Sequence, residues 1–334
     1  MGSIEVSVII PCRNEEKFIG ECLNSIVNQT YPKGGLEVFV LDGMSIDGTR
    51  AAVEEYTSQY PYIKRYENQG KSIPSAMNIG IKNSSGKIIM KVDAHTVYER
   101  DYIEKCVKYL KSSGADNVGG ITIAVPRENT IVGRAIVESL SSPFGVGGAK
   151  HRLNPKGPPI WADTAYSGCY RRDVFDRVGL YDENVSRSED VALNSRIRKS
   201  GGRILLVPEI RTYYQARSTF FEFCRHNLDN GFWITYPLKF RRVVFSVRHL
   251  VPLIFVMVLF GSLLLSFAHP AFLQLFTVVC GSYLVTNLFF SAKIAFIKKR
   301  PEYLVMMPII FASLHIFNGL GCVYGLVKTI LPKE

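Results

Sequence analysis

The sequence lacks closely spaced cysteines. Its seven cysteines are scattered over 334 residues and form no Cys-x-x-Cys motif, so the pattern supports neither a disulfide framework nor a structural zinc site. It also lacks an N-terminal secretory signal, because the first apolar run, at 6–10, is short and is followed by Pro-Cys-Arg-Asn-Glu-Glu. We therefore expect reduced cysteines and an N-terminal domain that stays in the cytosol.

Charged residues are missing from three long stretches near the C-terminus, at 250–268, 271–292 and 303–327. Nineteen helical residues, the length of the shortest stretch, reach about 28 Å, close to the hydrocarbon thickness of a bilayer. A soluble helix of this length would normally show a charged face. We therefore predict three membrane-spanning helices within a C-terminal region, 249–334. A transporter is disfavoured because the three stretches contain no charged residue.

Lys and Arg outnumber Asp and Glu by 40 to 29, for a net charge of +11. Basic residues, including Arg241 and Arg242, gather beside the uncharged stretches at 239–248 and 293–300. Loops rich in Lys and Arg remain on the cytoplasmic side of a membrane. The pattern predicts a multi-pass protein of the inner (plasma) membrane with a cytoplasmic N-terminal domain. It also places the last residues, 328–334, outside.

Aromatic and basic side chains alternate along residues 218–248. A groove for single-stranded nucleic acid can have this composition. Directly before a predicted span, however, an amphipathic segment at the membrane interface is favoured. We therefore expect a membrane as partner and no nucleic acid.

Strand and helix patterns alternate through residues 1–235. Strand-like runs occur at 6–10, 36–41, 63–66, 87–92, 117–125 and 203–206. Helical periods occur at 16–29, 50–58, 72–81, 102–112 and 188–199. This alternation predicts an α/β domain with a Rossmann-like, mostly parallel sheet whose ligands bind at the carboxyl ends of the strands.

Two acidic residues follow the second predicted strand. Asp42 lies where the strand ends, and a carboxylate there can accept a hydrogen bond from a uracil N–H or a ribose hydroxyl. Asp47 can instead cap the next helix through its turn. Turn chemistry alone would also produce Asp-x-x-Ser-x-Asp-Gly-Thr, so the residues by themselves leave both interpretations open.

A carboxylate and an imidazole follow the fourth predicted strand. Asp93 and His95 are two residues apart in an extended segment, so their side chains point the same way and can bind one divalent cation. Such a cation would neutralise a diphosphate. Glu189 and Asp190 open the last predicted helix, where the helix dipole favours acids. Asp190 is also placed to act as a general base that takes a proton from an acceptor hydroxyl. The two roles are compatible.

Several motifs occur in a characteristic order along roughly residues 4–235. They are Val8-Ile-Ile-Pro-Cys-Arg-Asn-Glu15, Leu41-Asp-Gly-Met-Ser-Ile-Asp-Gly-Thr49, Asn68-Gln-Gly70 with Ala76-x-Asn78-x-Gly80, Val92-Asp-Ala-His95, Gly168-Cys-Tyr-Arg-Arg-Asp-Val-Phe175, Val178-Gly-Leu-Tyr-Asp-Glu183 and Glu189-Asp190. In this order they resemble the GT-A-fold family 2 glycosyltransferases. The segment 142–152 and the apolar tail resemble, more narrowly, the membrane-bound succinoglycan-biosynthesis (ExoA-like) subgroup.

The resemblance implies a GT-A fold and an inverting glycosyltransferase with a UDP-sugar donor. The acceptor it implies is a polyprenyl-diphosphate-linked saccharide in exopolysaccharide or surface-glycan biosynthesis. A polyprenyl-phosphate sugar synthase, whose acceptor is the lipid phosphate itself, is the nearest alternative. A non-catalytic membrane scaffold with a vestigial nucleotide site is disfavoured, because Asp42, Asp93 and Asp190 are all present.

The resemblance also implies roles for particular residues. Asp190 would be the base, Glu189 beside it would be a second catalytic residue, and Asp93 and His95 would be the metal ligands. The nucleotide and its diphosphate would contact Pro11, Arg13, Glu15, Asp42, Lys71, Asp93, Lys150 and Arg152. The acceptor would contact Trp161, Arg217 and Trp233, although membrane anchoring would also explain Trp233. Lys150 and Arg152 fall in a Gly-rich segment, 141–160, which we expect to be a flexible loop over the diphosphates. An ordinary surface turn is the alternative.

Two departures from the family pattern carry information. Asp93-Ala-His95 stands where the family usually has Asp-x-Asp. An imidazole ligand favours Mn²⁺ over Mg²⁺. The Gln-x-x-Arg-Trp motif of processive polysaccharide synthases is missing, and Gln215-Ala-Arg217 matches it only in part. We therefore expect the addition of a single sugar.

Overall fold

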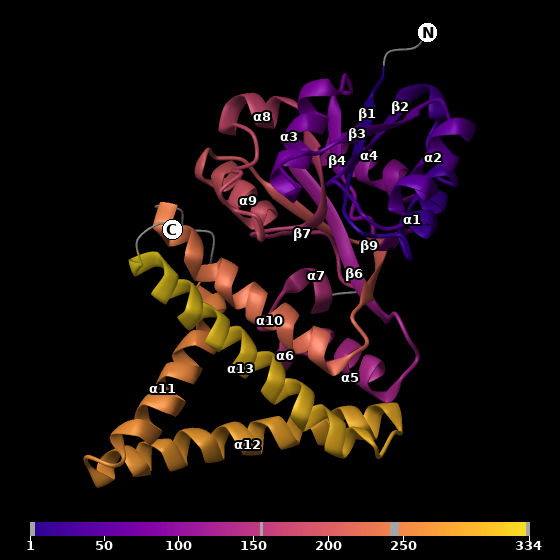
Figure 1. Ribbon diagram of the computed structural model, residues 1–334. Helices are drawn as coiled ribbons and strands as arrows, with labels where there is room; N and C mark the ends of the chain where they lie inside the picture. The colour runs from indigo at the N-terminus through magenta and orange to yellow at the C-terminus, as the bar shows by residue number, and fades with distance from the viewer. Residues whose placement is uncertain (1–3, 154–155, 241–246, 332–334) are drawn as a thin grey trace. The chain divides into compact units, whose positions relative to one another are not determined.

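The structure is a computed structural model that describes residues 4–153, 156–240 and 247–331. Its contacts divide the chain into two compact units (Figure 1). The sheet unit comprises Met1–Ile123 and Lys150–Tyr214, and the helical unit comprises Ala124–Ala149 and Gln215–Glu334. Residues 124–149 and 215–235 thus belong by contact to the helical unit, whereas the sequence places them in one domain ending at 235.

Nine strands in the described part of the chain form one sheet. They are β1 (Val6–Cys12), β2 (Leu36–Asp42), β3 (Ile63–Glu67), β4 (Ile88–Lys91), β5 (Thr96–Tyr98), β6 (Asn117–Pro126), β7 (Ile160–Trp161), β8 (Tyr166–Arg171) and β9 (Ile204–Ala216). Their order is β3-β2-β1-β4-β8-β6-β9-β5, with β7 paired to β9 off this path. The pairs among β3, β2, β1 and β4 are parallel, whereas β8 pairs antiparallel with β4 and β6.

The sheet is therefore mixed rather than mostly parallel. Its Rossmann-like half, β1 to β4, follows the prediction. In the other half, β6 and the start of β9 were predicted, but β5, β7 and β8 were missed. β5 has three residues, β7 has two, and β8 has an interior glycine, Gly168, so none gives a clear period. The longest strand, β9, extends from 204 to 216, well beyond the predicted 203–206.

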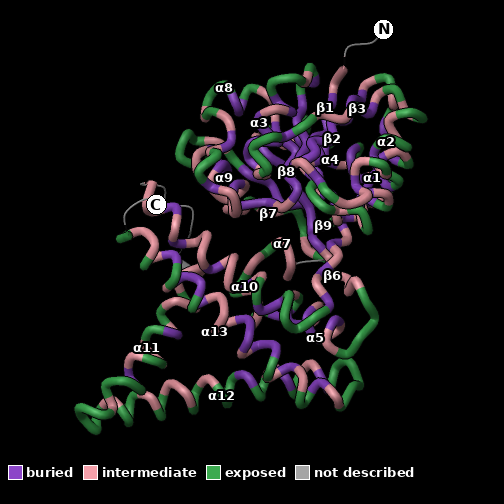
Figure 2. The backbone as a smooth tube through the Cα atoms, in the orientation of Figure 1, coloured by how far each residue is buried: buried purple, intermediate pink, exposed green. Residues whose placement is uncertain are grey.

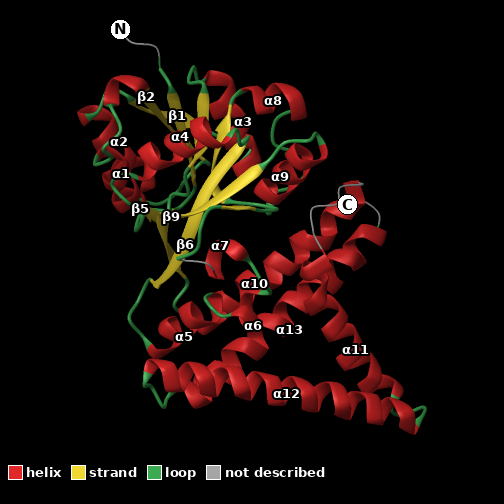
Figure 3. Ribbon diagram, turned by 180° about the vertical axis from the view of Figure 1, so that it is seen from behind, coloured by secondary structure: helices red, strands yellow, loops and turns green. Residues whose placement is uncertain are grey.

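Helices cover both faces of the sheet (Figure 3). They are α1 (Ile19–Val27), α2 (Thr49–Gln59), α3 (Ile73–Asn83), α4 (Tyr102–Ser113), α8 (Asp173–Val178) and α9 (Glu189–Lys199). The short helix α7 (Lys150–Leu153) also belongs to the sheet unit. Along β1, Val8 and Ile10 join the core under α1 and α4, while Ile9 points to the core shared by α3 and α9. This period of two fixes which strand residues face α9. Figure 2 shows the buried residues concentrated along the strands.

The segment 141–160 is not a continuous loop in its described part. The short helix α6 (Pro143–Val146) begins with proline at a first-turn position, where a backbone N–H is not needed. Positive φ angles at Gly147 and Gly148 end it, and α7 follows at Lys150. Residues 154 and 155 lie outside the described residues.

The helical unit contains α5 (Ile131–Leu140), α6, α10 (Phe220–Thr235), α11 (Val251–Leu265), α12 (Pro270–Lys298) and α13 (Tyr303–Ile330). Two helices, α12 with 29 residues and α13 with 28, are long and apolar enough to cross a membrane. The first predicted span is shorter than expected. Helix α11 has 15 residues, about 22 Å, whereas the hydrocarbon core is about 30 Å thick.

The shortening of α11 has a local cause. The chain turns at 266–268, and α12 then restarts at Pro270 with His269 as its cap, whose Nδ1 accepts a hydrogen bond from the Ala271 N–H at 3.1 Å. The predicted flanking residues Arg241 and Arg242 lie outside the described residues. The predicted amphipathic segment 218–248 is helical in α10, which occupies its first half.

Candidate active site

A cavity of about 190 Å³ opens where β1, β2 and β4 end. Six of the predicted residues line it, namely Pro11, Arg13, Glu15, Lys71, Asp93 and His95. They come from the end of β1, from the loops after β1 and β4, and from the segment before α3. The sequence prediction that ligand-binding residues gather at the carboxyl ends of the strands agrees with this arrangement.

Asn68 also lines this cavity, although no role was predicted for it. Its side-chain N–H donates to the Ser72 carbonyl at 2.9 Å, and its backbone carbonyl accepts from the Lys71 N–H at 3.1 Å. Lys71 adopts a φ of 55°, which is uncommon for a residue with a side chain. The Asn68 Oδ1 is buried and has no hydrogen-bond partner among the described residues. An orphaned acceptor in a cavity is typical of a ligand contact.

Asp42 is fully buried and already has partners on both carboxylate oxygens. Oδ2 lies 2.6 Å from Nε of Arg50, and Oδ1 accepts from the Ser45 N–H at 3.0 Å. Burial favours a neutral Asp42, but the hydrogen bonds from Ser45 and Arg50 hold its pKa below the ordinary value. Asp47 behaves as the turn interpretation predicted, because its Oδ1 accepts from the backbone N–H and the hydroxyl of Thr49.

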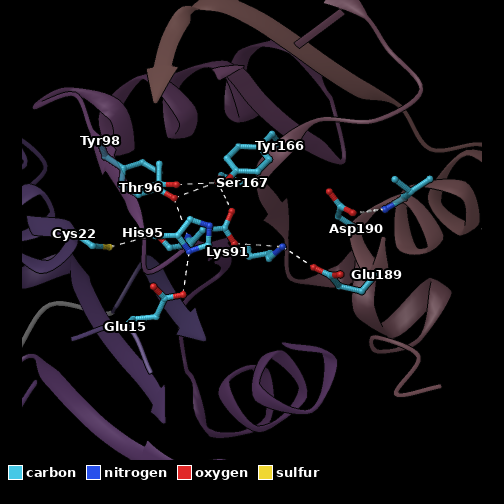
Figure 4. Close-up of polar contacts among 12 residues, drawn as sticks. Glu15, Cys22, Lys91, His95, Thr96, Tyr98, Tyr166, Ser167, Glu189 and Asp190 are labelled. Carbon is cyan, nitrogen blue, oxygen red and sulfur yellow. Dashed lines mark hydrogen bonds and ion pairs between the residues drawn. The ribbon is translucent and has the colours of Figure 1, made fainter. Parts of the chain in front are cut away.

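Lys91 bridges two acidic residues inside the sheet unit (Figure 4). Its ammonium lies 2.7 Å from Oε1 of Glu189 and 3.5 Å from Oδ1 of Asp93, and its side chain is only 6% exposed. Lys91 lies two residues after Ile89 on β4, so it faces the same side, toward α9. Burial would lower the pKa of Lys91, but the two carboxylates raise it well above its ordinary value.

The ion pairs with Lys91 also affect the pKa values of Asp93 and Glu189. Burial disfavours the anionic form of Asp93, yet Lys91 and His95 hold its pKa below the ordinary value. Burial raises the pKa of Glu189 against the opposing charge of Lys91. Glu189, which we predicted beside the base, is thus a buried ion-pair partner of Lys91. Lys91 itself gave no signal in the sequence, because a lysine in a short strand is usually exposed.

Asp93 and His95 both line the cavity, and their role as metal ligands stays a prediction. The Nδ1 atom of His95 lies 3.2 Å from Oε1 of Glu15, and no described residue hydrogen-bonds its Nε2. The described residues contain no group of three or more His, Cys, Asp or Glu that could hold a metal. A divalent ion on Asp93 and His95 would therefore need diphosphate oxygens or water as further ligands.

The sequence of residues 7–179 matches the model of glycosyl transferase family 2. The chain belongs to glycosyl transferase family 2. The predicted family is thereby confirmed, and the protein is a glycosyltransferase.

Two curated proteins resemble this glycosyltransferase over most of their length. It is 25% identical over 335 residues, 97% of each chain, to the Methanococcus voltae dolichyl N-acetyl-alpha-D-glucosaminyl phosphate 3-beta-D-2,3-diacetamido-2,3-dideoxy-beta-D-glucuronosyltransferase. It is 27% identical over 260 residues, 77% of each chain, to succinoglycan biosynthesis protein ExoA of Rhizobium meliloti. The predicted ExoA-like resemblance is thus supported by sequence similarity.

A solved structure resembles the glycosyltransferase as well. A mannosyltransferase from Pyrobaculum calidifontis, in complex with GDP-Man and Mn²⁺, superposes with a TM-score of 0.58 at 19% identity. The match covers 95% of this chain and 88% of the mannosyltransferase. This likeness, with the family match, confirms the predicted GT-A fold.

Asp190 differs from its neighbour Glu189 in its surroundings. It is half-buried at the start of α9, and its Oδ1 accepts a hydrogen bond from the Val191 N–H at 2.8 Å. Ser188, just before the helix, has a φ of 60°. The left-handed turn at this residue sets the direction in which the helix begins. The glycosyltransferase therefore presents one buried and one accessible acid in the same helical turn.

Aromatic side chains surround the cations of α7. The Arg152 guanidinium lies 5.6 Å from the centre of the Tyr214 ring, and that ring is 5.4 Å from His95. His151 stacks on Tyr166 at 6.4 Å. The Nη1 of Arg152 is buried without a hydrogen-bond partner among the described residues, so it is suited to bind an anion. Lys150 is exposed.

The three predicted acceptor contacts fall in different units. Trp161 lies on β7 in the sheet unit, 47% exposed, with the Arg203 guanidinium 4.5 Å from its ring centre. Arg217 and Trp233 belong to the helical unit. Trp233 is half-buried beside Phe232 and Tyr236, with edge-on ring contacts at 5.5 and 5.6 Å. The acceptor role of all three stays a prediction.

Proposed function

We propose that this glycosyltransferase transfers one sugar, with inversion, from a UDP-sugar to a polyprenyl-diphosphate-linked saccharide in exopolysaccharide or surface-glycan biosynthesis. The observation that carries the proposal is the cavity at the strand ends. It combines Asp93 and His95 with the cations of Arg13 and Lys71, a composition that suits a sugar nucleotide diphosphate. The names of the relatives from M. voltae and R. meliloti support a lipid-linked acceptor and a polysaccharide product.

In this proposal the residues of the cavity bind and orient the donor. Arg13, Lys71 and Arg152 would neutralise the diphosphate, and Asn68 would use its free Oδ1 to accept a hydrogen bond from the donor. Asp93 and His95 would hold a divalent ion, which stabilises charge on the departing diphosphate. Asp190 would take the proton from the acceptor hydroxyl as the new glycosidic bond forms and the bond to the diphosphate breaks.

We further propose that apolar helices of the C-terminal region hold the enzyme at the cytoplasmic face of the plasma membrane. This location gives access both to a soluble nucleotide sugar and to a polyprenyl lipid. Exposed apolar side chains cover α12, including Val278, Val285 and Phe289. Basic residues at 298–300 follow directly, where they would contact anionic headgroups.

The proposed reaction is tested by presenting the full-length enzyme in vesicles with UDP-sugars and, as a separate arm, with GDP-Man. The acceptors are a polyprenyl phosphate and a polyprenyl-diphosphate-linked sugar, and the readouts are nucleoside diphosphate release and the mass of the lipid product. We expect transfer from a UDP-sugar to the diphosphate-linked sugar. Transfer to the polyprenyl phosphate alone would instead identify a polyprenyl-phosphate sugar synthase. Transfer only from GDP-Man would refute the UDP-sugar assignment.

The metal assignment has its own prediction. The substitution His95→Asp restores the Asp-x-Asp pattern and replaces an imidazole by a hard oxygen ligand. We expect it to raise the ratio of Mg²⁺-supported to Mn²⁺-supported activity by about tenfold. The measurement is the initial rate at matched concentrations of each ion. An unchanged ratio, with activity retained, would show that His95 is not a metal ligand.

A further inference from the structure

Helix α13 is long and apolar enough to span a membrane. Helix α10, which packs against it, carries charged side chains that are disfavoured in lipid. Helix α10 runs alongside α13 in the same direction (Figure 1). A side chain on Gly231 of α10 would overlap the Asn318 carbonyl, and one on Gly321 of α13 would overlap the Leu228 carbonyl. The Thr235 hydroxyl donates to the Cys322 carbonyl at 2.7 Å. Wherever α13 lies, α10 therefore lies beside it.

Helix α10 carries charged residues on its exposed side. Glu222 and Arg225 are exposed, and Asp229 is half-buried in the part of the helix that packs on α13. If α13 crossed the bilayer, these groups would lie in hydrocarbon, where charged side chains are strongly disfavoured. In addition, α10 begins four residues after β9 ends at Ala216. No membrane crossing can intervene, so α10 starts on the side of the sheet unit.

Both ends of α13 are tied to segments on that same side. Near its N-terminus, the ammonium of Lys298 lies 2.6 Å from Oε1 of Glu138 on α5, which begins five residues after β6 ends at Pro126. Near its C-terminus, the Lys239 ammonium donates to the carbonyls of Lys328 at 3.3 Å and of Leu331 at 3.0 Å. A helix anchored to the same side at both ends does not cross a bilayer.

We propose that α13 lies flat at the cytoplasmic surface of the membrane, under α10, and that only the hairpin of α11 and α12 enters the lipid. The C-terminus is then cytoplasmic, in place of the external position that the apolar pattern predicted. The proposal rests on the membrane location proposed above. It leaves every cluster of basic residues flanking these helices on one side, as the positive-inside bias requires.

The exposed side chains of α13 match this arrangement. Val305, Ile309, Leu320 and Val327 are 68%, 46%, 36% and 49% exposed, and at about 100° per residue they fall within about 60° of one another, along one stripe of the helix. Of the other exposed apolar side chains, Ile330 lies about 20° outside this stripe, and Tyr324 and Leu304 lie about 40° and 100° outside it, on opposite edges. An interfacial helix presents such a single apolar face to lipid. Helix α12 differs, because its exposed apolar residues are distributed around the helix.

The depth of single nitroxide labels separates the two arrangements. Labels at Val305→Cys, Leu320→Cys and Val327→Cys, in a Cys280→Ser background, are measured by power saturation in phosphatidylcholine–phosphatidylglycerol vesicles. A flat α13 places all three at one shallow depth, about 5–10 Å into the headgroup boundary. A spanning α13 separates Val305 and Leu320 by about 22 Å along the membrane normal, and that result would overturn the proposal.

Labels on α12 make the two possible failures distinguishable. Val278→Cys and Val285→Cys are expected to lie deeper than all three α13 labels. If the α12 labels and the α13 labels are all in water, the membrane location itself is wrong, and the flat arrangement fails with it. If the α12 labels are as shallow as those on α13, the enzyme is at the membrane but the hairpin does not enter the lipid, which also overturns the proposal. As an independent readout, a green fluorescent protein fused after Glu334 is expected to fluoresce and an alkaline phosphatase there to be inactive. An active phosphatase with a dark fluorescent protein would refute a cytoplasmic C-terminus.

Discussion

The substitution Asp190→Asn is expected to lower kcat for sugar transfer by about 10²–10⁴-fold, the usual contribution of a general base. Asparagine keeps the size of the side chain but cannot take the proton of the acceptor hydroxyl. Nucleotide binding should change little, because the cavity residues at the strand ends are untouched. The measurements are single-turnover rates on the lipid-linked acceptor and UDP affinity by calorimetry.

The matched control is Asp101→Asn, the same change at the start of α4. Asp101 pairs with Lys105 at 2.9 Å on the surface, so its loss should leave kcat within about twofold, as for an exposed ion pair. A normal turnover for Asp190→Asn would show that another group accepts the proton. It would also favour a phosphate acceptor, which is already ionised near neutral pH and needs little help from a base.

The second large effect is on stability. The substitution Lys91→Met removes the cation between Asp93 and Glu189, whose side chains are 13% and 5% exposed. Removing one partner of a buried ion pair leaves an uncompensated charge, at a cost of about 3–5 kcal/mol in the free energy of unfolding. The melting temperature of the sheet unit should fall by about 10 °C. Thermal unfolding followed by circular dichroism measures it.

Two further variants show whether the lost charge is the cause. Lys105→Met removes a surface lysine paired with Asp101 and should cost about 0–1 kcal/mol. Lys91→Met combined with Glu189→Gln removes both charges and should recover part of the lost stability, because Gln can be buried without a counter-ion. If the double variant is as unstable as the sum of the single ones, Lys91 and Glu189 are not energetically coupled.

Much of the sheet unit was predictable, since its signals are local. Val8 and Ile10 alternate with Ile9 to opposite faces, and Ile19, Leu23 and Ile26 follow a helical period. The antiparallel half was not predictable in the same way. Its strands include a three-residue edge, β5, which forms because β9 supplies a partner for it and not because of any pattern within it.

The location of the candidate site could be predicted from the sequence, but the charged interactions within it could not. Pro11, Glu15 and Lys71 were placed by their motifs, and the structure brings them into one cavity. The ion pair of Lys91 with Glu189 joins residues 98 positions apart. No local pattern reports such a pair, because it depends on which face of β4 meets the start of α9.

The amino-acid sequence by itself determined the family, the order of the motifs and the existence of long uncharged helices. Each of these depends only on residues that are close together in the sequence: on motif spacing, on hydrophobic period or on the lack of charge. Only the tertiary structure decided which acid is buried against Lys91 and which remains accessible at the start of α9. It also decided that α13, apolar enough to span a membrane, packs along the charged helix α10. Hydropathy describes a helix alone, whereas the cost of burying charge depends on the helix packed beside it.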